Sequence, residues 1–226
     1  MVPDELTEAA FYGREDVAAL LDEGKVPLGL DLETVEPVTW DLKKGNLLYL
    51  TDKEEQMTQF VKQIAHSKQK VIVLVPAYNE LPEMEGVTIL STKEDYVAGI
   101  KKMEENIQLR LEQQKSQHEA TIVLYNQLEL MNDLGMDLQS SLNYVLEKGA
   151  RAGYATVAMS GSQLNRKIDE VSKSIKLYKQ AIVAMRITDQ SVLNVINRPV
   201  REEPLDSQVN YYVEDGFVRK VKVLMK

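Results

Sequence analysis

Three short, mainly apolar runs restrict the folds open to this chain more than any other feature. The runs are VIVLV (71–75), TIVLY (121–125) and AIVAMRI (181–187). A strand without alternating polar residues is buried on both faces, which is typical of a parallel sheet covered by helices. Segments with apolar residues at helical spacing lie between the runs, as at Met57, Phe60 and Ile64. The alternation predicts an α/β domain whose mostly parallel sheet is flanked by helices.

Further elements are predicted from turn and capping signals. VNYYVEDGFVRKVKVLM (209–225) predicts a C-terminal antiparallel hairpin, because Asp215-Gly216 tolerates positive φ. REDVAALLDEG (14–24) predicts a short helix, and 25–46 is expected to lead into the strand NLLYL (46–50). Ser91 and Glu94 have the spacing of a capping box that opens the longest helix, and 138–152 is expected to be another helix. We expect 1–24 to be a linker with a short helix and 25–226 to be one domain.

Composition excludes several kinds of site. The chain has 27 Lys and Arg against 35 Asp and Glu, a net charge of −8, which disfavours a nucleic-acid partner. It has no cysteine and therefore no thiolate metal site. His66 and His118 occur in polar contexts that we interpret as helical and solvated. No apolar run approaches the roughly 18 residues that span a bilayer, so we expect no membrane insertion of this segment.

The segment NLLYLTDKEEQMTQFVKQIA (46–65) has the outline of a phosphate-binding P-loop: an apolar strand, a short turn and an amphipathic helix. In a P-loop, glycines let backbone N–H groups surround the phosphates, and a lysine reaches the terminal phosphates. Here Thr51 and Gln56 stand at the glycine positions and Met57 stands at the lysine position. Of the positions that matter, Thr58 alone matches, at the place of the magnesium-binding hydroxyl.

Carboxylates crowd the start of the same helix. Asp52, Glu54 and Glu55 lie where a helix N-terminus would attract an anion, and the pairs Thr51/Glu54 and Asp52/Glu55 have capping-box spacing. We expect these side chains to satisfy the free N–H groups themselves. A phosphate placed there would meet three like charges, each close pair costing about 1 to 4 kcal/mol.

Six segments, in the same order along the chain, resemble the FtsK/SpoIIIE-type motor ATPases. They are PLGLDLETVEPVTWDLKKGNLLYL (27–50), TDKEEQMT (51–58), KEDYVAGIKKMEENIQLRLEQQ (93–114), TIVLYNQLELM (121–131), LEKGARAGYATVAMSG (146–161) and IKLYKQAIVAMRITDQSVLNVINRP (175–199). The second stands at the Walker A loop of that family and the fourth at its Walker B strand. The resemblance implies a P-loop NTPase (RecA/FtsK-like) core.

The resemblance also marks where catalytic groups are missing. The family's magnesium-orienting aspartate aligns with Tyr125 and its catalytic glutamate with Asn126, and neither side chain can replace a carboxylate. Glu129 matches a later family glutamate, or is simply an acid at a helix start. The family's polar sensor position falls on Gly161. Arg151 and Arg186 stand at positions that the family often keeps, either as surface residues or as fingers acting on a neighbouring module.

Degeneracy of this kind resembles the terminal (D3) module of the membrane-anchored coupling ATPases of type VIIb secretion. The resemblance implies a cytoplasmic domain of a cell-membrane protein, with secreted WXG100-like substrates or their adaptors and the preceding ATPase modules of the same chain as partners. It implies no catalytic residue, metal or cofactor in this domain, although the complete protein is expected to be an ATPase. The alternatives are an active or nucleotide-regulated ATPase with an atypical pocket, and a DNA translocase, which the negative charge disfavours.

Overall fold

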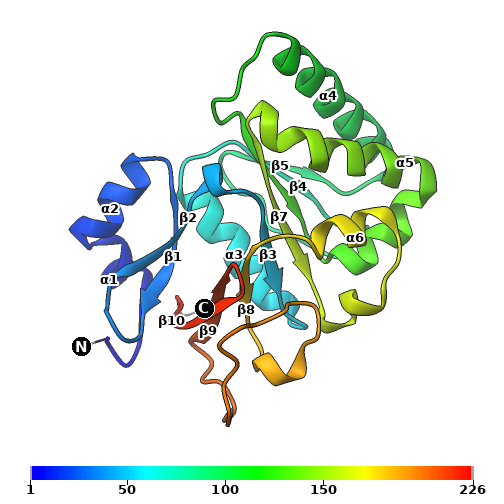
Figure 1. Ribbon diagram of the computed structural model, residues 1–226. Coiled ribbons are helices and arrows are strands. Elements are labelled where there is room, and N and C mark those ends of the chain that lie inside the picture. Colours follow the sequence, from blue (N-terminus) through cyan, green and yellow to red (C-terminus); the bar gives the residue numbers. More distant parts are fainter. Residues whose placement is uncertain (1, 225–226) are drawn as a thin grey trace.

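A ten-stranded mixed sheet organises residues 2–224, the part of the chain that the computed structural model describes (Figure 1). The strands are β1 (Val26–Asp31), β2 (Pro37–Trp40), β3 (Leu47–Leu50), β4 (Val71–Leu74), β5 (Val87–Leu90), β6 (Ala120–Leu124), β7 (Tyr154–Ser160), β8 (Gln180–Val183), β9 (Val209–Glu214) and β10 (Phe217–Lys222). Their order across the sheet is β2-β1-β10-β9-β8-β3-β7-β6-β4-β5.

The sheet is parallel from β8 to β5 and antiparallel from β8 to β2. β3 pairs in parallel with both β7 and β8, in the registers Leu47↔Val157 and Leu47↔Gln180. The hairpin β9–β10 pairs antiparallel with β8 on one side and β1 on the other. Its turn has positive φ at Asp215 (49°) and Gly216 (85°). The predicted fold class is therefore confirmed: a mostly parallel sheet flanked by helices, with a C-terminal antiparallel hairpin.

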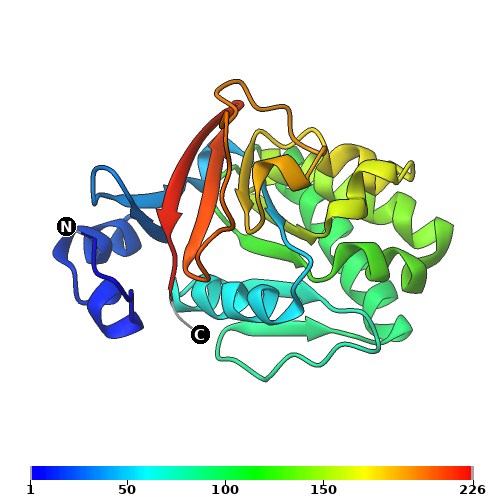
Figure 2. The same cartoon turned by 90° about the horizontal axis from the view of Figure 1, so that it is seen from below.

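Helices cover both faces of the sheet (Figure 2). They are α1 (Glu8–Tyr12), α2 (Glu15–Asp22), α3 (Glu54–His66), α4 (Lys93–Glu112), α5 (Gln127–Gly149) and α6 (Glu170–Ile175), with 3₁₀ turns η1 (Leu42–Lys44), η2 (Ala150–Ala152), η3 (Ser162–Arg166) and η4 (Ile187–Asp189). The apolar residues of α4, α5 and α6 pack in one core cluster, and those of α3 pack in a second. β6 contributes Ile122 to the first cluster and Val123 to the second, as expected for a strand between two helical layers.

The lead-in expected over 25–46 is instead a pair of strands. β1 and β2 pair antiparallel and extend the sheet beyond β10. A Cβ at Gly29 would lie 2.2 Å from the carbonyl oxygen of Lys222, so glycine is needed for β1 to approach β10. Sequence reasoning missed these strands because Pro27, Gly29 and Pro37 interrupt the pattern that normally marks a strand.

Two helix boundaries also differ from expectation. α5 begins at Gln127 rather than at 138, and it bends where Gly135 adopts φ 70° and ψ 169°. Because Gly135 divides α5 into two parts, the 20-residue α4 is the longest uninterrupted helix in the described part of the chain, as expected. The capping box of α4 lies one residue later than predicted: the Thr92 hydroxyl accepts from the Asp95 N–H (3.1 Å), and the Asp95 carboxylate accepts from the Thr92 N–H (3.2 Å).

The N-terminal helices pack on the outer part of the sheet. Phe11 and Val17 are buried with Leu30 of β1 and Leu224. The Tyr12 ring stacks on His66 at the end of α3, with 3.7 Å between ring centroids. His66 is exposed and helical, as expected, whereas His118 is exposed in the loop before β6 rather than in a helix. Within residues 2–224, no helix has both the length and the apolar composition to cross a bilayer.

Candidate functional site

The strands β3, β6 and β7 are parallel, so the loops that follow them meet at one edge of the sheet. The loop after β3 leads into α3, the loop after β6 holds Tyr125 and Asn126, and Gly161 follows β7. The fold therefore brings the Walker A positions Thr51, Gln56, Met57 and Thr58 to the same edge as the Walker B positions. These positions form the candidate site.

Thr58 and Tyr125 are joined directly by a hydrogen bond. Their hydroxyl oxygens lie 2.8 Å apart, and the Tyr125 hydroxyl also donates to the carbonyl oxygen of Glu54 (3.3 Å). Tyr125 is fully buried, and burial raises the pKa of its phenol above its usual range. The phenol therefore stays neutral at physiological pH. A magnesium ion bound by a P-loop would need the Thr58 hydroxyl that here contacts a neutral phenol.

Met57 is part of the hydrophobic core. Its exposed fraction is 4%, and it belongs to the cluster that contains Phe60, Val73 and Tyr125. At this position of a P-loop the lysine side chain reaches toward the phosphates. A thioether packed among apolar side chains offers a nucleotide no positive charge.

Thr51 and Asp52 do not cap α3 in the way expected from their spacing. The helix is preceded by Lys53, whose side chain makes no capping hydrogen bond. The Thr51 hydroxyl donates to the side-chain oxygen of Gln56 and accepts from the Lys53 N–H (3.1 Å). The expected Thr51/Glu54 and Asp52/Glu55 capping boxes are therefore wrong, because Thr51 and Asp52 bond to other groups.

The carboxylate of Asp52 instead fastens the loop after β3 to the loop after β7. It accepts hydrogen bonds from the backbone N–H (2.8 Å) and the hydroxyl (2.9 Å) of Ser162. A Cβ at Gly161 would lie 2.5 Å from this carboxylate, so the absence of a side chain there permits the contact. Sequence reasoning missed Ser162, because the two residues are 110 positions apart and no local pattern connects them.

Asn126 points toward a third loop. It adopts the left-handed conformation (φ 46°, ψ 59°), and its amide donates to the side-chain oxygen of Asn79 (3.1 Å). The same loop is held again where the Ala77 N–H donates to the carboxylate of Asp133 (2.8 Å). Asn126, which aligns with the catalytic glutamate of the FtsK/SpoIIIE-type motors, thus forms a neutral hydrogen bond with another side-chain amide.

A buried polar contact behind this edge was also missed. Gln127 is fully buried, donates to the Ser172 hydroxyl and accepts from the Ser160 hydroxyl, both at 2.9 Å. These bonds join the start of α5 to α6 and to the end of β7. Satisfied polar groups of this kind fix the relative positions of the elements around a core.

Arg151 and Arg186 lie at opposite ends of the parallel strands. Arg151 is in η2, just before β7 begins, whereas the other candidate residues follow strand ends. Arg186 follows β8 and forms two hydrogen bonds of 2.8 Å with the carboxylate of Asp189. Glu129 is exposed in the first turn of α5, where it accepts from Asn132 (3.2 Å). Within residues 2–224, neither Arg151 nor Glu129 is hydrogen-bonded to Thr58 or Tyr125.

The described part of the chain contains no cluster of metal-binding side chains. Within residues 2–224, no three His, Asp or Glu side chains gather where they could hold a metal ion. The contacts at this site join neutral groups, and the carboxylates of Asp52 and Asp133 are already hydrogen-bonded to the chain itself. These residues do not fit a magnesium-bound triphosphate.

Comparison with known proteins places these observations in context. No family model matches the chain. The type VII secretion system protein EssC of Staphylococcus aureus (strain MRSA252) is 25% identical over an alignment of 234 positions, which covers 99% of this chain and 16% of EssC. The structure of EssC (ATPases 2 and 3) from Geobacillus thermodenitrificans superimposes with a TM-score of 0.87 at 18% identity, covering 99% of this chain and 45% of that chain.

A third similarity is to EccC (ATPases 2 and 3) of Thermomonospora curvata in complex with a signal sequence peptide. Its TM-score is 0.71 at 15% identity, covering 100% of this chain and 44% of that chain. The P-loop ATPase-like fold predicted from the motifs is confirmed by these structures. Over nearly its whole length the chain is similar to an ATPase-like module of EssC, and it spans about one sixth of the length of the staphylococcal relative.

Proposed function

We propose that this chain is the terminal (D3) module of a type VII secretion ATPase, that it does not bind magnesium-ATP, and that it acts in substrate recognition and assembly. The general role is that of its EssC and EccC relatives. The observation that carries the proposal is the 2.8 Å hydrogen bond between Thr58 and Tyr125. It links the two positions that hold magnesium in a working motor, and it does so without any charged group.

Three features of the site together oppose nucleotide binding. Met57 provides no cation, Tyr125 and Asn126 provide no carboxylate, and Asp52 adds a negative charge beside the loop. A phosphate would have to displace the Asp52–Ser162 contact and approach that carboxylate. In residues 51–58, Lys53 is the one cation beside Asp52, Glu54 and Glu55, and Met57 at the lysine position adds none, so the repulsion is not compensated. We therefore expect no nucleotide cofactor in this module.

A binding role accounts for the hydrophobic core that the module keeps. Both core clusters are intact on either side of the sheet, so the fold does not depend on the lost catalytic groups. A related EccC structure of ATPases 2 and 3 contains a signal sequence peptide, which supports peptide recognition by modules of this fold. By this analogy the partners are WXG100-like secreted proteins or their adaptors, together with the preceding ATPase modules. The net charge of −8 favours cargo segments of positive charge.

Location follows from the same analogy. A relative is known as the cytoplasmic domain of EssC, and its likeness to this chain supports a cytoplasmic domain of a membrane-anchored protein. The alternative, an active or nucleotide-regulated ATPase, would require Tyr125 and Met57 to leave their buried positions. That rearrangement would expose apolar surface and break the Thr58 contact.

Two titrations test the proposal. Isothermal titration with millimolar magnesium-ATP is expected to give no saturable heat, and a signal that is lost in Thr58→Ala would overturn the loss of nucleotide binding. Titration of purified WXG100-type substrates is expected to give binding on the order of micromolar, weaker after removal of the cargo's C-terminal tail. Absence of binding at tens of micromolar by every substrate and adaptor of the system would overturn the recognition role.

A further inference from the structure

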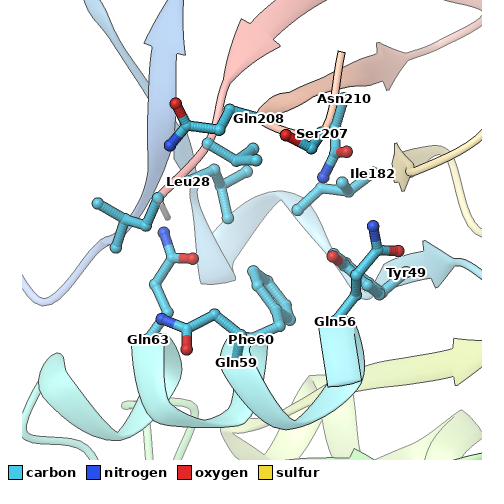
Figure 3. Close-up of a pocket in the computed structure, with 12 residues that line it drawn as sticks. Leu28, Tyr49, Gln56, Gln59, Phe60, Gln63, Ile182, Ser207, Gln208 and Asn210 are labelled. Carbon is cyan, nitrogen blue, oxygen red and sulfur yellow. The ribbon is translucent and has the colours of Figure 1, made fainter. Parts of the chain in front are cut away.

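A cavity of about 270 Å³ lies between α3 and the strands on the antiparallel side of the sheet (Figure 3). One wall is α3, which contributes Gln56, Gln59 and Gln63 from one helix face, at spacings of three and four residues. The opposite wall is the start of β9, with Ser207, Gln208 and Asn210. Side-chain amides therefore face each other across the cavity.

The cavity can be reached from solvent at one end. Ser207 is exposed, and Gln56 and Gln59 are half-buried. Gln63, Gln208 and Asn210 lie deeper, with exposed fractions of 7%, 7% and 4%. A ligand entering past Ser207 would therefore meet buried amides at the far end.

The lining carries no charge. The twelve described residues that line the cavity include no Asp, Glu, Lys, Arg or His. Tyr49 is the one titratable group among them, and burial raises the pKa of its phenol, so it remains neutral. A charged group placed here would lose its hydration without gaining a partner of opposite charge. The occupant of the cavity is therefore uncharged.

The carboxamides of Gln56 and Gln63 retain hydrogen-bonding capacity. The Gln63 amide nitrogen donates to the carbonyl oxygen of Pro27 (2.6 Å), and this bond does not use its side-chain oxygen. The Gln56 side-chain oxygen accepts from Thr51, and this bond does not use its amide nitrogen. Each carboxamide has two donor hydrogens and an acceptor oxygen, so it can bond to a ligand that offers both kinds of group.

We propose that this cavity binds an uncharged stretch of a partner polypeptide, with one apolar side chain inserted and its flanking peptide groups bonded to the amides. Peptide groups present one donor and one acceptor per residue, which matches a carboxamide lining. Leu28, Ile182 and Val223 supply the apolar surface for the inserted side chain. The volume is slightly below the usual range for small-molecule sites and suits one side chain with its adjoining peptide groups. The identity of the partner rests on the proposed function, whereas the ligand chemistry rests on the cavity.

Nuclear magnetic resonance titration of the intact chain with N-acetyl-leucine N-methylamide tests the chemistry. We expect saturable millimolar binding that shifts the side-chain amide signals of Gln59, Gln63 and Asn210 and the methyl signals of Ile182. N-acetyl-glutamate N-methylamide, of similar size but charged, is expected to bind at least about tenfold more weakly. The inference is overturned if the leucine compound gives no saturable shift, if the shifts map elsewhere, or if adenosine saturates the cavity and the leucine compound does not.

A pair of variants separates the cavity from the general surface. Gln59→Met removes a carboxamide from the half-buried wall while keeping a side chain of similar length, and we expect several-fold weaker binding. Gln108→Met makes the same change on the exposed face of α4 and is expected to leave binding unchanged. Equal affinity of the two variants for the leucine compound would contradict the proposal.

Full-length secreted substrates distinguish this inference from the proposed function. If a substrate binds the module equally well with and without Gln59→Met, recognition stands and the cavity is not its site. If no substrate binds while the leucine compound saturates the cavity, the proposed recognition role fails and the ligand chemistry stands.

Discussion

At the scale of single residues, Met57 shows how the Walker A position has become part of the core. Its 4% exposure places the end of any side chain at this position among apolar groups. We predict that Met57→Lys lowers the free energy of unfolding by about 2 kcal/mol or more, because a buried ammonium finds no partner. Met57→Leu is the control and should cost less than about 1.5 kcal/mol. Urea denaturation of both variants provides the measurement, and equal midpoints would show that the position is open to solvent.

A second prediction at this scale concerns the catalytic groups. We expect Met57→Lys combined with Tyr125→Asp and Asn126→Glu to remain without ATP hydrolysis. The loop would still lack the two glycines at Thr51 and Gln56, and Asp52 would still hold Ser162. Phosphate release at millimolar magnesium-ATP, with the unmodified chain as reference, is the assay. Steady turnover by a folded triple variant would show that the loop backbone can already surround a triphosphate.

The sequence indicated which residue types occupy the candidate site. It did not indicate the hydrogen bonds between them. The missing glycines and lysine could be seen at positions 51, 56 and 57 because a P-loop places them at a fixed spacing. The missing carboxylates at positions 125 and 126 were implied by the resemblance to the FtsK/SpoIIIE-type motors. The Thr58–Tyr125 and Asp52–Ser162 bonds join residues 67 and 110 positions apart. Such pairs are determined by strand order, which the sequence pattern alone leaves open. The local capping expectation for Asp52 was wrong because this distant hydroxyl is the partner.

At the scale of elements, the start of α4 offers a measurable contribution. Thr92 and Asp95 bond reciprocally across the first turn, and the Thr92 hydroxyl is the main cause that lowers the pKa of the Asp95 carboxyl. We predict that Thr92→Ala costs about 1 kcal/mol of unfolding free energy, the usual contribution of an N-cap. Ser116→Ala, in the exposed loop after α4, is the matched hydroxyl deletion and should have no measurable effect. Equal stability of the two variants would contradict a capping role for Thr92.

Element prediction succeeded where one signal dominated and failed where signals competed. The apolar runs at β4 and β6 and the turn at Asp215-Gly216 follow from burial and backbone preference alone. β1 contains Pro27 and Gly29, which normally argue against a strand, yet pairing with β10 stabilises it. The early start of α5 was missed because Gly135 divides its apolar pattern into two parts.

At the scale of the whole molecule, buried tyrosines make stability depend on pH in the alkaline range. Burial raises the pKa of Tyr49, Tyr125 and Tyr212 in the folded chain, whereas unfolded tyrosine titrates near pH 10. A group whose folded pKa is raised contributes stability that is complete below its unfolded pKa and is lost as pH rises toward the folded value. We predict a constant urea midpoint from pH 8 to about 9.5 and a progressive decline above about pH 10. A midpoint that stays level to pH 11.5, with ultraviolet absorbance showing that these tyrosines ionise near pH 10 while the chain is still folded, would contradict this.

The two edge strands of the sheet affect how copies of this chain associate. Its edge strands are β2 and β5, each four residues long, and β2 begins with Pro37. Short edges and edge prolines oppose pairing between sheets of different molecules. The net charge of −8 adds repulsion between copies, and under the proposed function no bound nucleotide bridges neighbours. We therefore predict that the isolated chain is a 25.6 kDa monomer at micromolar concentration, with or without magnesium-ATP. Light scattering coupled to size-exclusion chromatography measures this mass directly, and a hexamer, or a mass that rises when ATP is added, would show that the module retains a motor's mode of assembly.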